Sequence, residues 1–242
     1  MRRVLILGGT AEARALAAEL VERGLQVVSS LAGRVTSPRL PVGEVREGGF
    51  GGPDGLAAWL EAERIDAVVD ATHPFAARMT ASAAEVARRT GVPLLILRRP
   101  GWSQAPDDVW DRVSSLEAAA GRLLPGDRVF LTTGRRSLPL FAVLESVWFL
   151  ARSVDPPEPP VPAHVLVVLD RGPYTVEGEL ALIREHRLTV LVTKDSGGSM
   201  TTAKLAAARR AGLRVIMVDR PPLPSGLGLT QSVADAADWA QG

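Results

Sequence analysis

The sequence predicts an α/β protein of two domains, each built on a mainly parallel sheet flanked by helices, with a ligand cleft between them. Two observations lead to this class. Short apolar runs of strand length alternate with Ala-rich segments of helical pattern, and such alternation is typical of parallel sheets that helices cover on both faces. The length of 242 residues also suits two small domains.

The predicted strands are short, largely apolar runs. They are Val4–Leu7, Leu25–Ser29, Ala67–Asp70, Leu94–Leu97, Arg128–Leu131, Val147–Leu150, Val165–Leu169, Val190–Thr193 and Arg214–Val218. The predicted helices lie between many of them and are Ala11–Arg23, Asp54–Glu63, Ala76–Thr90, Leu116–Leu123, Glu177–His186, Thr201–Ala211 and Val233–Ala240. A loop over residues 99–106 contains prolines, a glycine and a tryptophan. We therefore predict an N-terminal domain over residues 1–105 and a C-terminal domain over residues 106–242.

Composition excludes several classes of function. The formal net charge is only +1, so the chain has no general positive field for nucleic acid or an anionic membrane. There is no cysteine, which excludes disulfides and thiolate metal sites, and the separated histidines form no recognisable metal motif. No run approaches the roughly 18 apolar residues that span a bilayer. With no signal peptide visible either, we expect a cytoplasmic protein.

The segment Gly8–Ala13 follows the first predicted strand and opens the first predicted helix. The dinucleotide fingerprint G-x-G-x-x-G has the same placement, although Thr10 and Ala13 stand here at its second and third glycine positions. A helix N-terminus presents backbone N–H groups to an anion. We therefore expect cofactor phosphates to bind at Gly8, Gly9, Thr10, Ala11 and Glu12. The alternative is a tight turn that binds nothing.

The end of the second predicted strand favours one dinucleotide over another. Sites specific for NAD carry an acidic residue there, which hydrogen-bonds a ribose hydroxyl. This chain has Ser29 and Ser30 followed by Arg34, and hydroxyl and guanidinium groups suit a ribose 2′-phosphate. The sequence thus predicts NADPH as the cofactor, with a solvated surface charge as the alternative role for Arg34.

Two other loops of the first half follow predicted strands. Thr72 and His73 come after the strand Ala67–Asp70, and ligands of open α/β sheets bind beyond the carboxyl ends of the strands. We expect both residues to contact the cofactor. His73 is also a candidate proton donor, and its alternative role is to hold the turn before a proline. Gly49 lies in a glycine-rich segment that is predicted to form a flexible lip of the same crevice.

Loops of the second half combine basic and small residues. Arg135 and Arg136 follow one predicted strand, and Arg171 follows another. Lys194 and Asp195 follow a third predicted strand and precede Ser196, Gly197 and Gly198, and the next predicted helix carries Lys204. Small residues at a helix start leave N–H groups open to an anion, and Lys194 adds a full charge. A second anion-binding region is therefore expected here.

Four motifs together resemble the precorrin-6A reductase family of cobalamin biosynthesis. They are residues 6–13, residues 70–76, residues 132–135 and residues 193–198, and the resemblance spans nearly the whole chain. It implies two Rossmann-like domains and an NADPH-dependent reduction of one ring double bond of precorrin-6A, giving precorrin-6B. It also implies that the N-terminal domain holds most of the cofactor, while the C-terminal domain positions the nicotinamide and the tetrapyrrole. It also suggests other enzymes of the pathway as partners.

A carboxylate-fringed ring agrees with the basic loops of the second half. The expected substrate-binding residues are Arg135, Arg136, Arg171, Lys194, Ser196, Gly197, Gly198 and Lys204. In hydride transfer the protein mainly has to position the nicotinamide against the substrate, because the cofactor supplies the chemistry. His73 and Asp195 are the candidates for proton delivery, and for Asp195 the alternative is a turn-forming role.

Two other functions fit the same pattern. A two-domain transferase that uses a nucleotide-linked donor would also bind diphosphate in Rossmann-like halves, and so would a non-catalytic dinucleotide sensor. The Ser29–Arg34 segment discriminates between them, because a reductase of this kind should bind NADPH well above NADH. The motifs leave both a cobalt-containing and a metal-free tetrapyrrole open.

Overall fold

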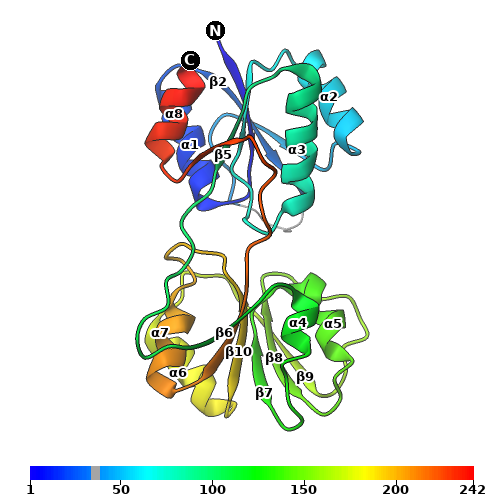
Figure 1. Ribbon diagram of the computed structural model, residues 1–242, viewed down its shortest axis with the longest axis vertical. Coiled ribbons are helices and arrows are strands. Elements are labelled where there is room, and N and C mark those ends of the chain that lie inside the picture. The colour runs from blue at the N-terminus through cyan, green and yellow to red at the C-terminus, as the bar shows by residue number, and fades with distance from the viewer. Residues whose placement is uncertain (34–38) are drawn as a thin grey trace. The chain divides into compact units, whose positions relative to one another are not determined.

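The computed structural model describes residues 1–33 and 39–242, and the chain divides into two compact units (Figure 1). Unit 1 contains Met1–Pro100 and Pro221–Gly242, and unit 2 contains Gly101–Arg220. The chain therefore passes from one unit to the other twice. Each unit is described below by itself.

Unit 1 is built on a six-stranded parallel sheet in the order β12-β5-β4-β1-β2-β3. Its strands are β1 (Arg3–Leu7), β2 (Gln26–Leu31), β3 (Glu44–Glu47), β4 (Ala67–Asp70), β5 (Leu94–Leu97) and β12 (Gly228–Thr230). Its helices are α1 (Ala11–Glu22), α2 (Pro53–Ala62), α3 (Ala77–Thr90) and α8 (Val233–Gln241). The central strand β1 is almost wholly buried, as expected for a sheet covered on both faces.

Two helices cover each face of this sheet. Helices α1 and α8 share a core with one face, where Leu16 and Leu20 meet the small residues Ala236, Ala237 and Ala240. Helices α2 and α3 close the other face over a core that includes Leu5 and Leu7. Small residues allow the close approach of α8 to α1, which Figure 1 shows as red beside blue.

Unit 2 repeats this plan with the order β6-β11-β10-β7-β8-β9, again all parallel. Its strands are β6 (Val109–Val113), β7 (Arg128–Leu131), β8 (Trp148–Ser153), β9 (Val165–Leu169), β10 (Val190–Lys194) and β11 (Arg214–Val218). Its helices are α4 (Leu116–Ala120), a 3₁₀ turn over Arg135–Ser137, α5 (Leu138–Ala142), α6 (Val176–Glu185) and α7 (Ala203–Ala211). Phe130, Leu150 and Met217 are fully buried on the face that α6 and α7 cover.

The predicted fold class is confirmed, and each predicted strand and helix is present with small shifts at its ends. The prediction omitted the strands β3, β6 and β12 and the short helix α5. These three strands share one property, because each lies at an edge of its sheet. An edge strand is paired on one side only and needs no continuous apolar run, and β3 accordingly reads Glu-Val-Arg-Glu.

The predicted division into residues 1–105 and 106–242 differs from the two compact units. Residues 221–242 belong to unit 1, because β12 pairs with β5 and α8 packs on α1. The first crossing lies at Pro100–Gly101, a few residues before the predicted boundary. Periodicity identified α8 as a helix but carried no information on which sheet it covers.

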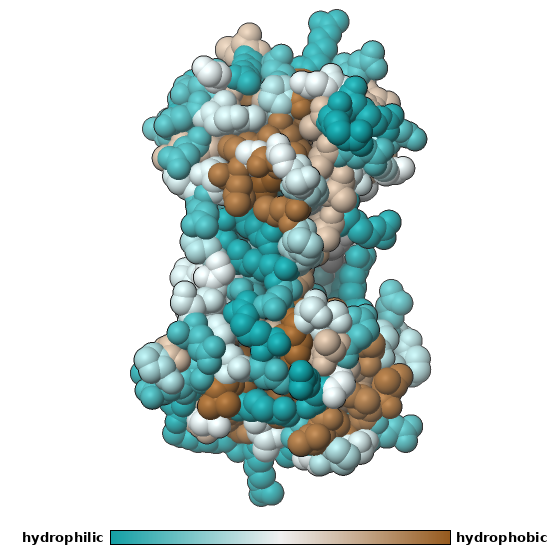
Figure 2. All heavy atoms as spheres, viewed as in Figure 1, coloured by the Kyte–Doolittle hydropathy of each residue, from teal (hydrophilic) through white to brown (hydrophobic). Residues whose placement is uncertain are grey.

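No helix in the described part of the chain is long and apolar enough to span a bilayer. Hydrophilic residues occupy much of the visible face of each unit, with apolar groups between them (Figure 2). Exposed large apolar residues of unit 2 include Val143, Leu166 and Leu169. Two of these belong to the edge strand β9.

Candidate functional site

The loop between β1 and α1 is fixed on both sides by hydrogen bonds. The backbone N–H of Gly8 donates to the carbonyl of Ser30 at 2.9 Å, which ties the loop to the end of β2. The Thr10 hydroxyl donates to the carbonyl of Ala71 at 2.7 Å and accepts from the N–H of Ala13 at 3.1 Å. Thr10 is thus the N-cap of α1 and a link to the end of β4. This explains why a threonine can replace the second glycine of the fingerprint.

The space above this loop is open to a ligand. Gly9 has φ of +107°, which favours glycine, and a Cβ placed on it would meet no atom within 4 Å. The N–H groups of the first helical turn have no acceptor inside the helix. The Glu12 carboxylate forms an ion pair with Arg99 at 2.8 Å, which offsets a negative charge beside the N-terminus of α1. The loop can therefore accept a diphosphate through its backbone.

The serine hydroxyls at the end of β2 are less available to a ligand than the sequence suggested. The Ser29 hydroxyl is enclosed and has no hydrogen-bond partner among the described residues, so it would have to move to reach a ligand. The Ser30 hydroxyl instead accepts a hydrogen bond from Arg46 Nη1 at 2.8 Å. Arg34 lies outside the described residues. Arg46, on β3, is a residue that the sequence reasoning missed, because the short polar strand that carries it was not recognised.

Asp70 organises the loop that follows β4. Its buried carboxylate accepts hydrogen bonds from the backbone N–H and hydroxyl of Thr72, at 3.0 and 2.7 Å, and from the hydroxyl of Thr80 at 2.6 Å. His73 is exposed, and its Nδ1 accepts from the N–H of Phe75 at 3.2 Å. These contacts hold the turn before α3. Proton transfer by His73 stays a prediction.

In unit 2, the loops after β7 and β10 lie side by side because these strands are paired. The Lys194 ammonium group donates to the carbonyl of Thr133 at 2.9 Å, and burial lowers the pKa of this lysine. Gly134 has φ of +92°, and Arg135 donates from Nη1 to the carbonyl of Pro156 at 3.2 Å. Lys194 and Arg135 are therefore brought to one region, and anion binding by this pair stays a prediction.

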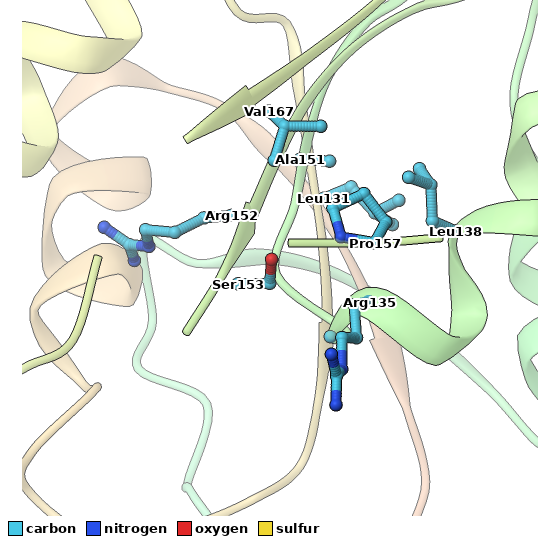
Figure 3. Close-up of a pocket in the computed structure, with 9 residues that line it drawn as sticks. Leu131, Arg135, Leu138, Ala151, Arg152, Ser153, Pro157 and Val167 are labelled. Atoms are coloured by element: carbon cyan, nitrogen blue, oxygen red, sulfur yellow. The ribbon is translucent and has the colours of Figure 1, made fainter. Parts of the chain in front are cut away.

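A small, open hollow lies at the carboxyl ends of β7 and β8. Apolar groups make much of its wall, and the lining consists of Leu131, Gly134, Arg135, Leu138, Ala151, Arg152, Ser153, Pro157 and Val167. In Figure 3 the guanidinium of Arg152 points away from Leu138 and Pro157. Arg135 is thus the predicted substrate residue that lines this hollow.

Arg152 belongs to a buried group that we call the Arg152 cluster, which comprises Arg152, Tyr174, Glu179 and Lys204. The guanidinium of Arg152 binds both carboxylate oxygens of Glu179, at 2.6 and 3.2 Å, and lies 3.6 Å from the centre of the Tyr174 ring. Lys204 is 5% exposed, and its ammonium lies 4.9 Å from the centre of the Trp102 ring. Burial, with the positive charge of Arg152, lowers the pKa of Lys204 to about 7. Glu179 therefore pairs directly with Arg152, and its charge also acts on Lys204.

Asp195 anchors both ends of unit 2. Its Oδ1 accepts from the backbone N–H of Trp102 at 2.9 Å, and its Oδ2 accepts from Arg112 at 3.0 Å. The Asp195 carbonyl accepts from Arg220 at 2.7 Å. Both carboxylate oxygens are engaged as acceptors, which suits an anchor better than a proton donor. The backbone of Gly101 packs so closely that a Cβ there would lie 2.8 Å from Oδ2.

The other predicted residues of unit 2 differ in their surroundings. Gly197 and Gly198 have φ of +66° and +77°, and the carbonyl of Gly198 accepts from the Trp102 indole at 2.9 Å. The N–H of Ser196 donates to the carbonyl of Lys194 at 2.6 Å. Arg136 and Arg171 are exposed. Among the described residues, no group of three or more His, Asp or Glu side chains could hold a metal ion.

Comparisons with known proteins agree over the whole chain. A family model described as Precorrin-6x reductase CbiJ/CobK matches residues 3–241. A precorrin-6A reductase of Rhodococcus erythropolis is 55% identical, with 99% of this chain and 97% of the relative covered. A cobalt-precorrin-6A reductase of Priestia megaterium is 29% identical, with 92% of each chain covered. The solved structure of a CobK precorrin-6A reductase has a TM-score of 0.93 at 41% identity, covering 100% of this chain and 96% of that one.

Proposed function

Given that the chain belongs to the precorrin-6x reductase family, we propose that it reduces one ring double bond of precorrin-6A with NADPH to give precorrin-6B. Membership makes the protein an oxidoreductase of cobalamin biosynthesis, the class that the sequence motifs predicted. The observation that best supports a dinucleotide cofactor is the β1–α1 loop, where Gly9 leaves open space beside the N-terminus of α1. NADPH and the residues that bind it are part of the proposal.

The residues of unit 1 suit a phosphate-rich dinucleotide. When bound, NADPH supplies the hydride that one ring carbon accepts, while the adjoining ring atom takes a proton. The loop from Gly8 to Glu12 would hold the diphosphate through backbone N–H groups, and Thr10 fixes that loop to β4. Thr72, held by Asp70, would border the same crevice beyond the strand ends. The main task of these residues is then to orient the cofactor and the substrate, and the proposal assigns no residue as proton donor.

The residues of unit 2 suit a ligand with many carboxylates. Lys194 and Arg135 provide cations at the ends of neighbouring strands, beside a hollow whose wall is largely apolar. A tetrapyrrole combines an apolar ring with carboxylates at its rim, so both kinds of surface are required. Charge-assisted hydrogen bonds from lysine and arginine are the strong contacts that carboxylates make. We propose this region as the substrate site.

The relatives favour a metal-free tetrapyrrole. Those named precorrin-6A reductase include one 55% identical to this chain, whereas those named cobalt-precorrin-6A reductase include one 29% identical. We therefore propose precorrin-6A itself as the natural substrate. Parallel assays with precorrin-6A and its cobalt complex test this choice, and a higher kcat/KM for the cobalt complex would reverse it.

Product mass gives the decisive test of the reaction. Purified protein with precorrin-6A and NADPH should yield a product that has gained two hydrogen atoms, with oxidation of an equal amount of NADPH. NADPH deuterated at C4 on the reactive face should deliver one deuterium. An unchanged mass with bound NADPH would favour the sensor, and addition of a larger group from a nucleotide-linked donor would favour the transferase.

A lysine variant separates the two sites. Lys194→Met should raise KM for precorrin-6A roughly tenfold or more, because a charge-assisted bond to a carboxylate is worth about 1.5–3 kcal/mol. Its Kd for NADPH should stay close to that of the unaltered protein. Arg184→Gln, on the exposed side of α6, is the matched control. Loss of NADPH affinity in Lys194→Met, with KM unchanged, would place this lysine in the cofactor site.

A further inference from the structure

Arg46 occupies a defined position at the carboxyl end of β3, next to the end of β2. Its Nη1 donates to the Ser30 hydroxyl at 2.8 Å and to the carbonyl of Gly48 at 3.1 Å, and its Nη2 donates to the carbonyl of Gly49 at 3.2 Å. The guanidinium carbon lies 3.8 Å from the centre of the Phe50 ring. Three hydrogen bonds and an aromatic ring therefore hold this cation in one orientation.

The charge of Arg46 has no counter-ion in the described part of the chain. Four other arginines of unit 1 pair with carboxylates: Arg3 with Glu44 and Glu63, Arg23 with Glu19 and Asp238, Arg89 with Asp54 and Glu85, and Arg99 with Glu12. No carboxylate of residues 1–33 or 39–242 lies within ion-pair distance of Arg46. Desolvation, with no compensating charge, lowers the pKa of this arginine. A half-buried, uncompensated guanidinium is costly without a ligand and favours an anion.

The hydrogen-bond geometry leaves donors for such an anion. A guanidinium carries five N–H groups, and the bonds to Ser30, Gly48 and Gly49 engage Nη1 twice and Nη2 once. Nε makes no hydrogen bond to the described residues, and Nη2 makes one, to Gly49. Two neighbouring N–H groups on one edge match two oxygens of a phosphate group.

The position of Arg46 relates it to the dinucleotide crevice. Ser30 joins the two regions, since its carbonyl accepts from Gly8 of the phosphate loop and its hydroxyl accepts from Arg46. In Rossmann sheets the diphosphate lies at the first helix N-terminus, and the ribose next to it reaches the end of the second strand. No acidic residue stands at that end to bind a free 2′-hydroxyl, because β2 finishes in Ser30 and Leu31.

We propose that Arg46 binds the 2′-phosphate of NADPH and thereby sets the preference for NADPH over NADH. This inference rests on the proposed function, because it presumes that the dinucleotide binds in unit 1. The glycine-rich segment after β3 gains a specific role from it. The carbonyl groups of Gly48 and Gly49 hold the guanidinium, so the segment positions a cation instead of serving only as a flexible lip.

Binding measurements on Arg46→Gln and Arg46→Lys test the inference. The probes are NADPH against NADH, and adenosine 2′,5′-bisphosphate against 5′-AMP, by calorimetry on the full chain. Arg46→Gln should weaken NADPH and the bisphosphate roughly 10- to 100-fold, the size expected for a lost charge-assisted pair. Affinity for NADH and 5′-AMP should change less than about threefold. Arg46→Lys should lie between the two, because it keeps the charge but loses the paired N–H edge.

The outcomes separate this inference from the proposed function. Arg89→Gln, in which an exposed arginine of unit 1 is altered, should leave all four affinities unchanged. If the unaltered protein prefers NADPH and Arg46→Gln keeps that preference, the inference is overturned and the proposed function stands. Equal weakening of NADH and NADPH would reveal a structural role for Arg46 and would also overturn it. If the unaltered protein shows no preference for NADPH, the proposed cofactor fails together with this inference.

Discussion

Units 1 and 2 share the order of five of their six strands, but the loops at the carboxyl ends of these strands carry different residues. In unit 1 the first loop is glycine-rich and tied down by Thr10, and it leaves backbone N–H groups open. In unit 2 the corresponding end carries the Arg152 cluster and Lys194, which are charged side chains with restricted access to water. Under the proposed function, phosphates would therefore bind to backbone groups in unit 1 and carboxylates to side chains in unit 2.

This difference has energetic consequences. A site made of backbone N–H groups requires no buried charge, because helix N-termini carry unsatisfied N–H groups in any fold. A buried cluster of charges is costly to build, since each ion must be taken out of water. Unit 2 should thus be the unit whose stability depends on individual charged residues and on pH.

The largest expected effect lies in the Arg152 cluster. Glu179→Gln should lower the free energy of unfolding of unit 2 by about 3–5 kcal/mol, because it leaves Arg152 and Lys204 without a buried counter-charge. Denaturant unfolding measures the loss. Glu185→Gln, at an exposed position of the same helix, should change the stability by less than about 0.5 kcal/mol. A similarly small loss for Glu179→Gln would remove the contrast between the units.

A smaller effect concerns pH and Lys204, which faces Arg152 and Glu179. Its pKa is about 7 in the folded protein against an ordinary value of 10.5. Between these values the unfolded chain binds more protons, so the free energy of unfolding should rise with pH. Lys204→Met should lack this rise, which amounts to about 2 kcal/mol from pH 7 to pH 9.

Unfolding of both proteins across that pH range gives the comparison for Lys204. The Arg184→Gln variant should keep the rise of the unaltered protein, since this exposed residue lies outside the cluster. Parallel pH profiles for the unaltered protein and Lys204→Met would show that Lys204 stays charged, and the cluster would then carry a full extra positive charge at neutral pH.

The smallest effect compares two helix caps of similar geometry. Thr10 and Ser115 each accept a hydrogen bond from the N–H three residues on, at 3.1 Å in both cases. Thr10→Ala and Ser115→Ala should each cost roughly 1–2 kcal/mol of stability. Only Thr10→Ala should also weaken NADPH binding, because Thr10 holds the phosphate loop to Ala71. Equal NADPH affinity in the two variants would indicate that the diphosphate does not bind at this loop.

Local pattern was enough to predict the fold class, the central strands and several loops of the candidate site. Buried parallel strands must be apolar on both faces, so β1, β4, β7 and β10 stand out in the sequence. Small residues after such strands mark turns that open helices, which led to the Gly8–Ala13 loop and to Lys194. The motifs also identified the family, because their order along the chain does not depend on tertiary contacts.

Tertiary structure alone decided which segments meet. The polar strand β3 is recognisable only from its pairing with β2, and its side chain Arg46 reaches Ser30 across 16 residues of sequence. The C-terminal strand β12 returns to β5, and Arg152 pairs with Glu179 on α6. Hydrophobic pattern reports whether a segment is buried, while edge pairing and ion pairs depend on partners that only the folded chain brings together.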